Sequence, residues 1–198
     1  MRPLLPISTV LTLLLASHAS AAEVPQAAQT CVACHGVLGE GTPQAPKLAG
    51  LSSSYMNAQI EHFISGDRNN VIMTLMAESL VDLNVRQQAL DYYAKQGTTP
   101  TLQKRGDNLN QSAAEKLYYQ GDLHRSLPAC YSCHGPSAVG GGHFPRLAGQ
   151  QSSYLKEQLI AWQKNERKGD PDNTMGHIAS KLKDTEIQAL ADYLSAIK

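Results

Sequence analysis

The six residues Cys31-Val-Ala-Cys34-His35-Gly36 decide how this chain is organised, because they recur as Cys130-Tyr-Ser-Cys133-His134-Gly135, 99 residues further along. The same offset relates two later stretches. Pro46-Lys-Leu-Ala-Gly50 matches Pro145-Arg-Leu-Ala-Gly149, and Ser53-Ser-Tyr55 matches Ser152-Ser-Tyr154. Two copies of one long unit indicate the duplication of a whole domain rather than a solenoid, which repeats a short unit many times.

The pattern Cys-x-x-Cys-His is the attachment signal for c-type haem. On one helical turn both thiols can form thioethers with the porphyrin vinyl groups, and the histidine that follows can ligate the iron. The sequence therefore predicts two covalently attached haem c groups, held by Cys31, Cys34 and His35 and by Cys130, Cys133 and His134. Two disulfides or a zinc site are the alternatives. Neither of them explains a histidine at the same place in both copies.

The N-terminal residues 1–22 are typical of a cleaved secretory signal peptide. Arg2 supplies a positive charge, residues 7–16 are mostly apolar, and small residues precede the expected cleavage site. A membrane anchor is the alternative, but the apolar run is well short of the roughly 20 residues that a membrane span needs. We therefore expect the mature chain to be exported.

The rest of the chain is predicted to form two domains. Residues 23–98 make the first, and Gly97-Thr-Thr-Pro100 ends its last helix. Residues 99–111 are polar and are predicted to be a linker, and residues 112–198 make the second domain. Ser112–Gln120 is expected to be a short helix that opens this domain.

The fold class is predicted to be all-α, with each small helical domain built around one haem. Apolar residues recur at helical spacing, and Asp184 is a candidate N-cap for the last helix. The segments 35–52 and 134–151 are rich in Gly and Pro and are expected to be loops. Only 6% of the residues are aromatic, so the haem would supply apolar bulk to small cores. The helical positions are Leu155, Leu159, Trp162, Ile187, Leu190, Leu194 and Ile197.

The charge of the chain excludes a nucleic-acid-binding protein that works through gross positive charge, because the net charge is zero. The two halves differ, however. Residues 23–99 hold four Lys/Arg against seven Asp/Glu, whereas residues 100–198 hold twelve against ten. The difference predicts either ordinary solvated surfaces or a dipolar molecule whose two ends meet different partners.

The second axial ligand of each iron is predicted to be a methionine. Met175 is the only methionine in the second unit, and Met56 falls on a helical stripe and is expected to pack in the core. In the first unit Met73 and Met76 both remain candidates. The ungapped offset pairs Met76 with Met175, but the local pattern Met-x-x-(Met/Ile)-Ala-x-x-Leu pairs Met73 with Met175 if the second unit has a loop insertion, which we favour.

Several duplicated residues are candidates for supporting roles. The carbonyl of Pro46 or Pro145 could accept a hydrogen bond from the imidazole of the haem histidine and fix the ring. Arg68 and Arg167 could pair with haem propionates or could be solvated charges. Tyr55 and Tyr154 could pack on the haem edge or simply begin helices. The remaining histidines are expected to be incidental surface residues, namely His62, His124, His143 and His177.

With these motifs the chain resembles the cytochrome c4 family of periplasmic two-haem c-type cytochromes. The resemblance covers nearly all of the mature sequence and implies a small helical cytochrome c fold in each half. It also implies that His35 pairs with Met73, and His134 with Met175, as iron ligands. Members of the family carry electrons in respiratory chains and can associate with the membrane surface. Expected partners are a donor such as a quinol-oxidising complex and an acceptor such as a terminal oxidase.

Two functions are consistent with the residues. An electron carrier needs both axial positions filled, and a methionine in each distal loop favours this reading; no catalytic residue is then expected. The alternative is a two-haem enzyme, such as a peroxidase-like protein, in which one iron keeps an open site.

Overall fold

The protein is described by a computed structural model that covers residues 23–97 and 112–197. The predicted signal peptide and the whole of the predicted linker lie outside these residues, so the domain boundaries remain predictions. Every regular element of the described residues is helical, as the all-α prediction requires, and the only strand-like features there are isolated β-bridges.

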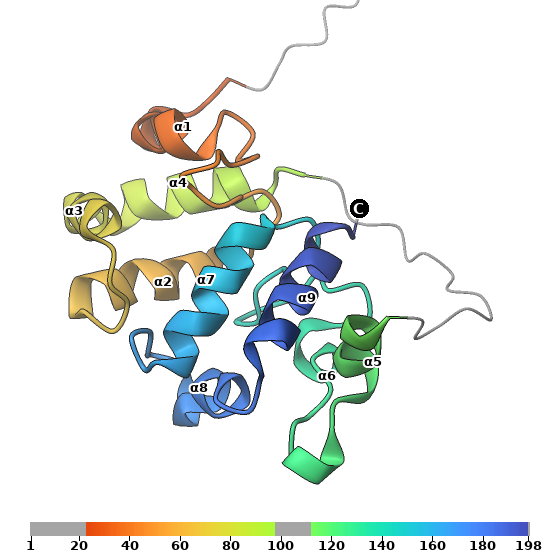
Figure 1. Ribbon diagram of the computed structural model, residues 1–198. Coiled ribbons are helices and arrows are strands. Elements are labelled where there is room, and N and C mark those ends of the chain that lie inside the picture. Colours follow the sequence, from red (N-terminus) through yellow and green to blue (C-terminus); the bar gives the residue numbers. More distant parts are fainter. Residues whose placement is uncertain (1–22, 98–111, 198) are drawn as a thin grey trace, which may run out of the picture.

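The first half contains a 3-10 turn and four α-helices, which Figure 1 shows in red to yellow-green. α2 packs against both α3 and α4, and α4 also covers the 3-10 turn η1. Two small apolar clusters form the core, one around Met56 near the start of α2 and one around Ile60 and Phe63 nearer its end. The elements are η1 (Gln26–Ala28), α1 (Gln29–His35), α2 (Ser53–Ser65), α3 (Val71–Ser79) and α4 (Leu83–Ala94).

The second half repeats this arrangement, with α7 in the place of α2 and α8 in the place of α3. α9 packs against both α5 and α7, and this contact forms the largest apolar cluster of the described residues. The elements are α5 (Ala113–Gln120), η2 (Leu123–Arg125), α6 (Tyr131–His134), α7 (Ser152–Gln163), η3 (Pro171–Asn173), α8 (Thr174–Ala179) and α9 (Asp184–Ser195).

Short polar side chains determine where several helices begin. Ser52 Oγ accepts a hydrogen bond from Tyr55 N at 3.2 Å, and Asn70 Oδ1 accepts one from Met73 N at 2.9 Å. Ser112 caps α5 in the same way, so the predicted short helix is confirmed. The prediction that Asp184 caps α9 is wrong. Lys183 is the N-cap, because Glu186 reaches back to accept from Lys183 N and leaves Asp184 as the first helical residue.

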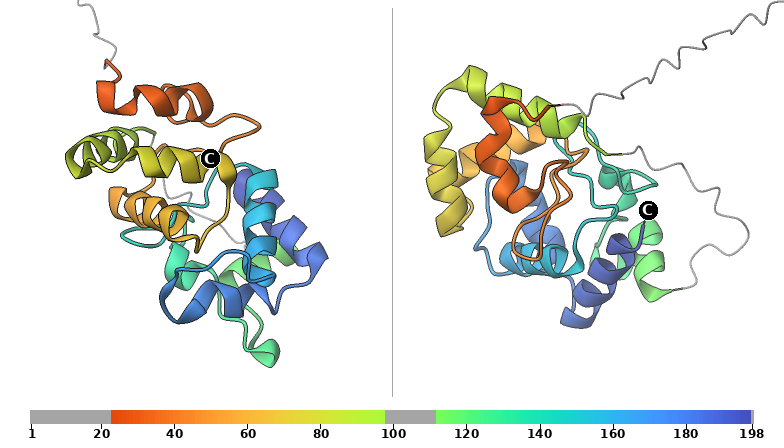
Figure 2. Two further views of the ribbon diagram at one scale, coloured as in Figure 1. Left: turned by 90° about the vertical axis from the view of Figure 1, so that its left-hand side faces the viewer. Right: turned by 90° about the horizontal axis from the view of Figure 1, so that it is seen from above.

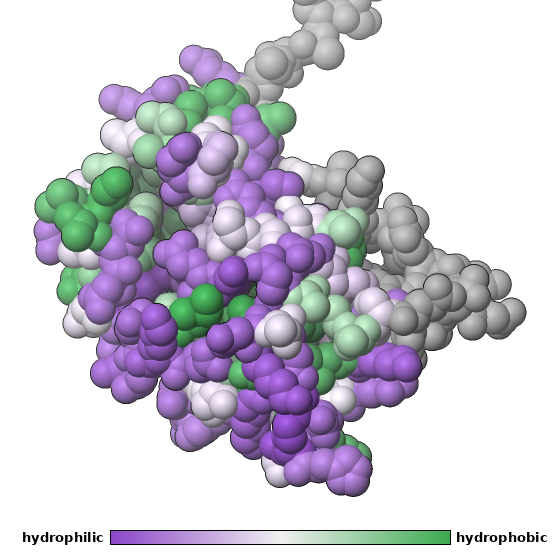
Figure 3. Space-filling model, in the orientation of Figure 1, coloured by the Kyte–Doolittle hydropathy of each residue, from purple (hydrophilic) through white to green (hydrophobic). Residues whose placement is uncertain are grey.

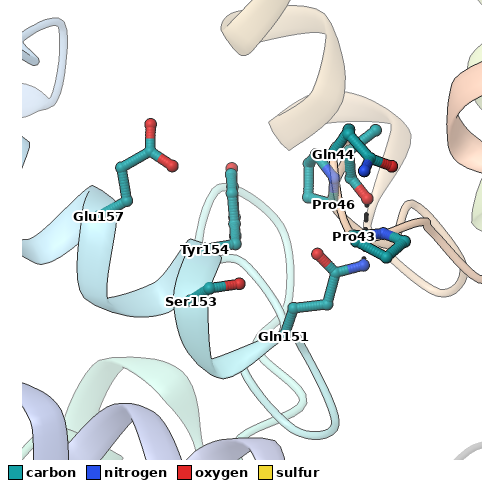
Figure 4. Close-up of a pocket in the computed structure, with 8 residues that line it drawn as sticks. Pro43, Gln44, Pro46, Gln151, Ser153, Tyr154 and Glu157 are labelled. Atoms are coloured by element: carbon teal, nitrogen blue, oxygen red, sulfur yellow. Dashed lines mark hydrogen bonds between the residues drawn. The ribbon is translucent and has the colours of Figure 1, made fainter.

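The predicted loops are confirmed, and they bring the two halves together. Figure 2 shows the two halves side by side, with their loops between them. Lys47 N–H donates to Gln150 Oε1 and Gln150 Nε2 donates back to Lys47 O, both at 3.0 Å. Gln151 Nε2 donates to Thr42 O and Ala45 O. Gln151 thereby spans a small pocket between the loop of the first half and the start of α7 (Figure 4).

None of the helices within the described residues has the length and apolar character that crossing a membrane would require.

Candidate haem sites and the interface between the two halves

Each Cys-x-x-Cys-His motif lies on a short helix that ends at a glycine. α1 carries Cys31, Cys34 and His35, and α6 carries the second motif with Cys130 as its N-cap. Gly36 adopts φ +84°, a conformation that favours glycine, and a Cβ there would lie 2.3 Å from the Glu40 carboxylate. The chain therefore turns sharply after each histidine and returns toward it through the loop.

Both motif histidines are buried and oriented by a proline carbonyl. His35 Nδ1–H donates to Pro46 O at 2.8 Å, and His134 Nδ1–H donates to Pro145 O at 3.0 Å. The predicted role of the two prolines is thus confirmed. Burial lowers the pKa of both histidines, and the proline carbonyls oppose this only in part. The lowered pKa favours the neutral imidazole, and the bond from Nδ1–H to the proline carbonyl leaves Nε2 as the ring atom that could ligate a metal.

The four cysteines are free thiols, so the disulfide alternative does not hold in this structure. Burial raises the pKa of the Cys31 thiol, and it raises that of Cys130 to about 11. Cys34 and Cys133 are exposed. The described residues also contain no group of three or more His, Cys, Asp or Glu side chains arranged to hold a metal ion, as a zinc site would need. Paired free thiols beside a buried neutral imidazole fit covalent haem.

The structure separates the two candidate methionines of the first half. On α3, Met73 is half-buried against the cluster of Ile60, Phe63 and Ala77, whereas Met76 is exposed. On α8, Met175 is likewise half-buried. Met56 is buried in the core, as expected.

The equivalence of α3 and α8 supports the alignment that pairs Met73 with Met175 and places a loop insertion in the second half. Ala77 and Ala179 are both fully buried, each four residues after the half-buried methionine. The extra residues of the second half lie before Met175, where Asp172 and Asn173 adopt positive φ angles. The structural counterpart of Met175 is therefore Met73, although the role of either side chain as an iron ligand remains a prediction.

Arg68 and Arg167 are buried and cross between the two halves, so the alternative that they are solvated charges is wrong. Arg68 Nη2 donates to Tyr154 OH at 2.6 Å, and Arg167 Nη2 donates to Tyr55 OH at 3.0 Å. Their backbones form an antiparallel bridge, and each guanidinium lies over an aromatic ring of its own half. The exchanged contacts give this interface an approximate twofold symmetry.

Two glutamines complete this cluster, and sequence reasoning missed their role. Gln59 Oε1 accepts from Arg68 at 3.0 Å and from Arg167 at 2.8 Å. Gln158 Oε1 accepts from Arg167 at 2.8 Å and from Arg68 at 3.0 Å. The match of Gln59 with Gln158 at the 99-residue offset was the available signal. We call Arg68, Arg167, Gln59, Gln158, Tyr55 and Tyr154 the arginine cluster.

The Asp170 carboxylate, whose charge acts on Arg167 and whose buried Oδ1 has no partner among the described residues, offsets only one of the two positive charges of the arginine cluster. The acceptors bound to both guanidinium groups are uncharged oxygens of tyrosine and glutamine. Arg167 Nε has no hydrogen-bond partner among the described residues and is buried. Burial raises the pKa of Tyr55, but the charges of Arg167 and Arg68 together outweigh this and lower it. Tyr55 and Tyr154 lie in the first turns of α2 and α7 and serve the interface.

The four histidines of the described residues that lie outside the two motifs differ in their exposure. His124, His143 and His177 are exposed, as expected. His62 is half-buried instead, because its ring packs over Gly169 of the other half, where a Cβ would lie 2.5 Å from His62 Nε2. Lys168 N donates to Asp67 O beside this contact.

Two tyrosines hold the glycines that follow the motif histidines, and sequence reasoning missed both. Tyr93 OH donates to Gly36 O at 3.2 Å, and Tyr118 OH donates to Gly135 O at 2.6 Å. Both rings are almost fully buried. They come from α4 and α5, helices that are not related by the 99-residue offset, so comparison of the two copies could not find them.

Known proteins match this architecture over nearly the whole chain. The family model of cytochrome c matches residues 21–91 and 111–198. A thiosulfate dehydrogenase electron acceptor of Thiomonas intermedia (strain K12) is 39% identical, with 99% of this chain and 91% of that protein covered.

Two solved structures have the same fold. Reduced cytochrome c4 from Pseudomonas stutzeri matches with a TM-score of 0.76 and 30% identity, over 90% of this chain and 100% of that one. The thiosulfate dehydrogenase TsdBA from Marichromatium purpuratum matches with a TM-score of 0.75 and 37% identity over 85% of this chain. This chain spans only 36% of the length of that protein.

The duplicated motif, the two prolines that orient its histidines and these matches lead to one conclusion. The chain belongs to the cytochrome c4 family of the cytochromes c, electron carriers in which two tandem cytochrome c folds hold two covalently bound haem c groups.

Proposed function

We propose that this cytochrome accepts electrons from a thiosulfate dehydrogenase and delivers them to a respiratory acceptor such as a terminal oxidase. The observation that carries the proposal is the similarity, over 99% of the chain, to a protein named as the electron acceptor of such a dehydrogenase. The match to part of a thiosulfate dehydrogenase from Marichromatium purpuratum supports the same donor. A quinol-oxidising complex remains the competing donor.

We further propose His35 with Met73, and His134 with Met175, as the axial ligands of the two irons. The buried, neutral imidazoles with Nε2 free support the histidine assignments, and the matching burial of the two methionines supports the rest. Haem iron bound in this way supplies a one-electron couple, and a thioether ligand raises its potential relative to a second histidine. With both axial positions filled, a substrate has no place on the iron, which opposes the peroxidase-like alternative.

The arginine cluster is proposed to meet the haem propionates. The two buried guanidinium groups donate only to neutral oxygens, and Asp170 offsets one of their two charges. With Arg167 Nε unpartnered among the described residues, the cluster is suited to a carboxylate brought in by the cofactor. Since each arginine reaches into the other half, the same residues would hold the two haem-binding halves in one orientation.

The place of action is proposed to be the periplasm, on the basis of the predicted signal peptide and the similarity to cytochromes c4.

The test mixes the oxidised holoprotein with thiosulfate and a purified thiosulfate dehydrogenase, and follows haem reduction by stopped-flow absorbance. Thiosulfate without the dehydrogenase and the dehydrogenase without thiosulfate are the controls. We expect rapid reduction of both haems only in the complete mixture. Reduction by a purified quinol-oxidising complex, without reduction by the dehydrogenase, would replace the proposed donor.

A further inference from the structure

The first half exposes an apolar surface that its fold does not require. Met73 and Ala77 face the core of the first half, and at helical spacing Val71 and Leu75 lie on the opposite side of α3. The exposed fractions of these two side chains are 81% and 61%. Figure 3 shows apolar side chains gathered over α3. We define the α3 patch as Val71, Ile72, Leu75, Val81 and Leu83, all of them exposed.

The second half provides an internal comparison for this patch. With Met73 aligned on Met175, the equivalent positions are also exposed, but their side chains are polar. The five equivalents of the α3 patch, in order, are Asn173, Thr174, His177, Lys183 and Thr185. The same helical fold around a haem therefore tolerates polar residues there, and the apolar residues of the first half need another explanation. Contiguous exposed apolar residues of this kind usually mark an interaction surface.

The charges around the α3 patch indicate what kind of partner it fits. Between Leu51 and Ala94 the only lysine or arginine residues are Arg68 and Arg86, and both are buried. Arg86 is moreover paired with Glu61. Glu78 is exposed on α3 itself, and Asp82 lies between Val81 and Leu83. The patch is thus apolar with an acidic rim, which disfavours the anionic surface of a membrane and suits a protein with a basic rim.

We propose that the α3 patch is the docking surface for the electron-donating protein, which presents an apolar area ringed by lysine and arginine. This inference rests on the proposed function, since it takes the thiosulfate dehydrogenase as that donor. The α3 patch lies on the helix that carries Met73, so docking there brings the donor to the first haem-binding half. Apolar contact at the centre supplies the affinity, and the acidic rim steers the encounter.

The experiment compares the holoprotein with the double variant Leu75→Gln/Leu83→Gln. The matched control is Leu123→Gln, which changes a side chain of the second half that is 85% exposed. Reduction by thiosulfate and purified thiosulfate dehydrogenase gives the second-order rate constant by stopped flow. Reduction by ascorbate reports whether the haem sites are intact, independently of docking.

We expect the double variant to lower the rate constant with the dehydrogenase by about tenfold, as removal of central interface residues does, and the control to leave it unchanged. Ascorbate reduction should be equal in all three proteins. A second variant, Glu78→Gln, should weaken the dependence of the rate constant on salt concentration without removing the apolar contact.

The outcomes separate the two proposals. If the unaltered protein is reduced by the dehydrogenase and the double variant is reduced equally fast, the docking surface is wrong and the proposed function stands. If the dehydrogenase does not reduce the unaltered protein, both proposals fail. Sedimentation and flotation with phosphatidylglycerol vesicles test the other occupants. A dimer, or vesicle binding, that the double variant abolishes would assign the α3 patch to a second copy of the chain or to a membrane.

Discussion

Replacement of Gln158 by Met tests whether the arginine cluster couples the two halves of the protein. The Oε1 atom of Gln158 accepts from Arg167 at 2.8 Å and from Arg68 at 3.0 Å, one arginine from each half. Methionine has nearly the same volume, so the substitution leaves little cavity. It removes two hydrogen bonds from charged donors that stay buried. Each such bond contributes about 1.5–3 kcal/mol, so we expect the free energy of unfolding to fall by about 3–6 kcal/mol.

Gln163→Met is the matched control, because it lies on the same helix but serves only the second half. Gln163 Nε2 donates to Leu182 O at 2.9 Å, a neutral partner, so its loss should cost about 1 kcal/mol. Urea unfolding of the holoproteins, followed by the fluorescence of Trp162, measures both effects. Hydrogen exchange with mass spectrometry then locates them.

The helices in which hydrogen exchange becomes faster show whether the arginine cluster couples the two halves. Gln158→Met should accelerate exchange in α2 of the first half as well as in α7, whereas Gln163→Met should affect the second half alone. If exchange in α2 is unchanged by Gln158→Met, the arginine cluster does not couple the halves and the reasoning is refuted.

Three further predictions concern individual side chains. Met175→Ala should let added cyanide bind the second haem and should lower its potential while the first stays unchanged; persistence of the sulfur-to-iron absorption band would contradict the ligand assignment. Burial, aided by Arg167 and Arg68 and opposed by Asp67 and Asp170, lowers the pKa of His62. The unfolded chain therefore binds more protons below the ordinary value of 6.5, and the stability measured by urea should fall as the pH drops through that range. This loss should vanish in His62→Gln, and an equal loss in that variant would exclude His62 as its source. Tyr118→Phe leaves the partly buried Gly135 carbonyl without its 2.6 Å partner and should cost about 1–2 kcal/mol in urea unfolding; an unchanged midpoint would show that water replaces the hydroxyl.

The sequence by itself determined the haem-binding motifs and much of the helical framework, because these depend on local spacing. Two thiols and an imidazole within one helical turn specify covalent haem wherever the turn lies in the fold. The carbonyls of Pro46 and Pro145 were predictable for the same reason, since each follows its histidine by the same short loop. The N-cap of α9 was predicted one residue too late. The Glu186 carboxylate accepts a hydrogen bond from Lys183 N, which makes Lys183 the N-cap and Asp184 the first helical residue.

Only the tertiary structure decided the roles that depend on burial between distant segments. The bond from Arg68 to Tyr154 spans 86 residues and that from Arg167 to Tyr55 spans 112, so no local pattern distinguishes these arginines from solvated ones. The sequence pattern favoured Met73 over Met76 without excluding Met76, and the packing of Met73 on the core face of α3 supports that preference. Helical period shows which side chains share a face, but the neighbouring helices determine which face is buried and which remains open to a partner.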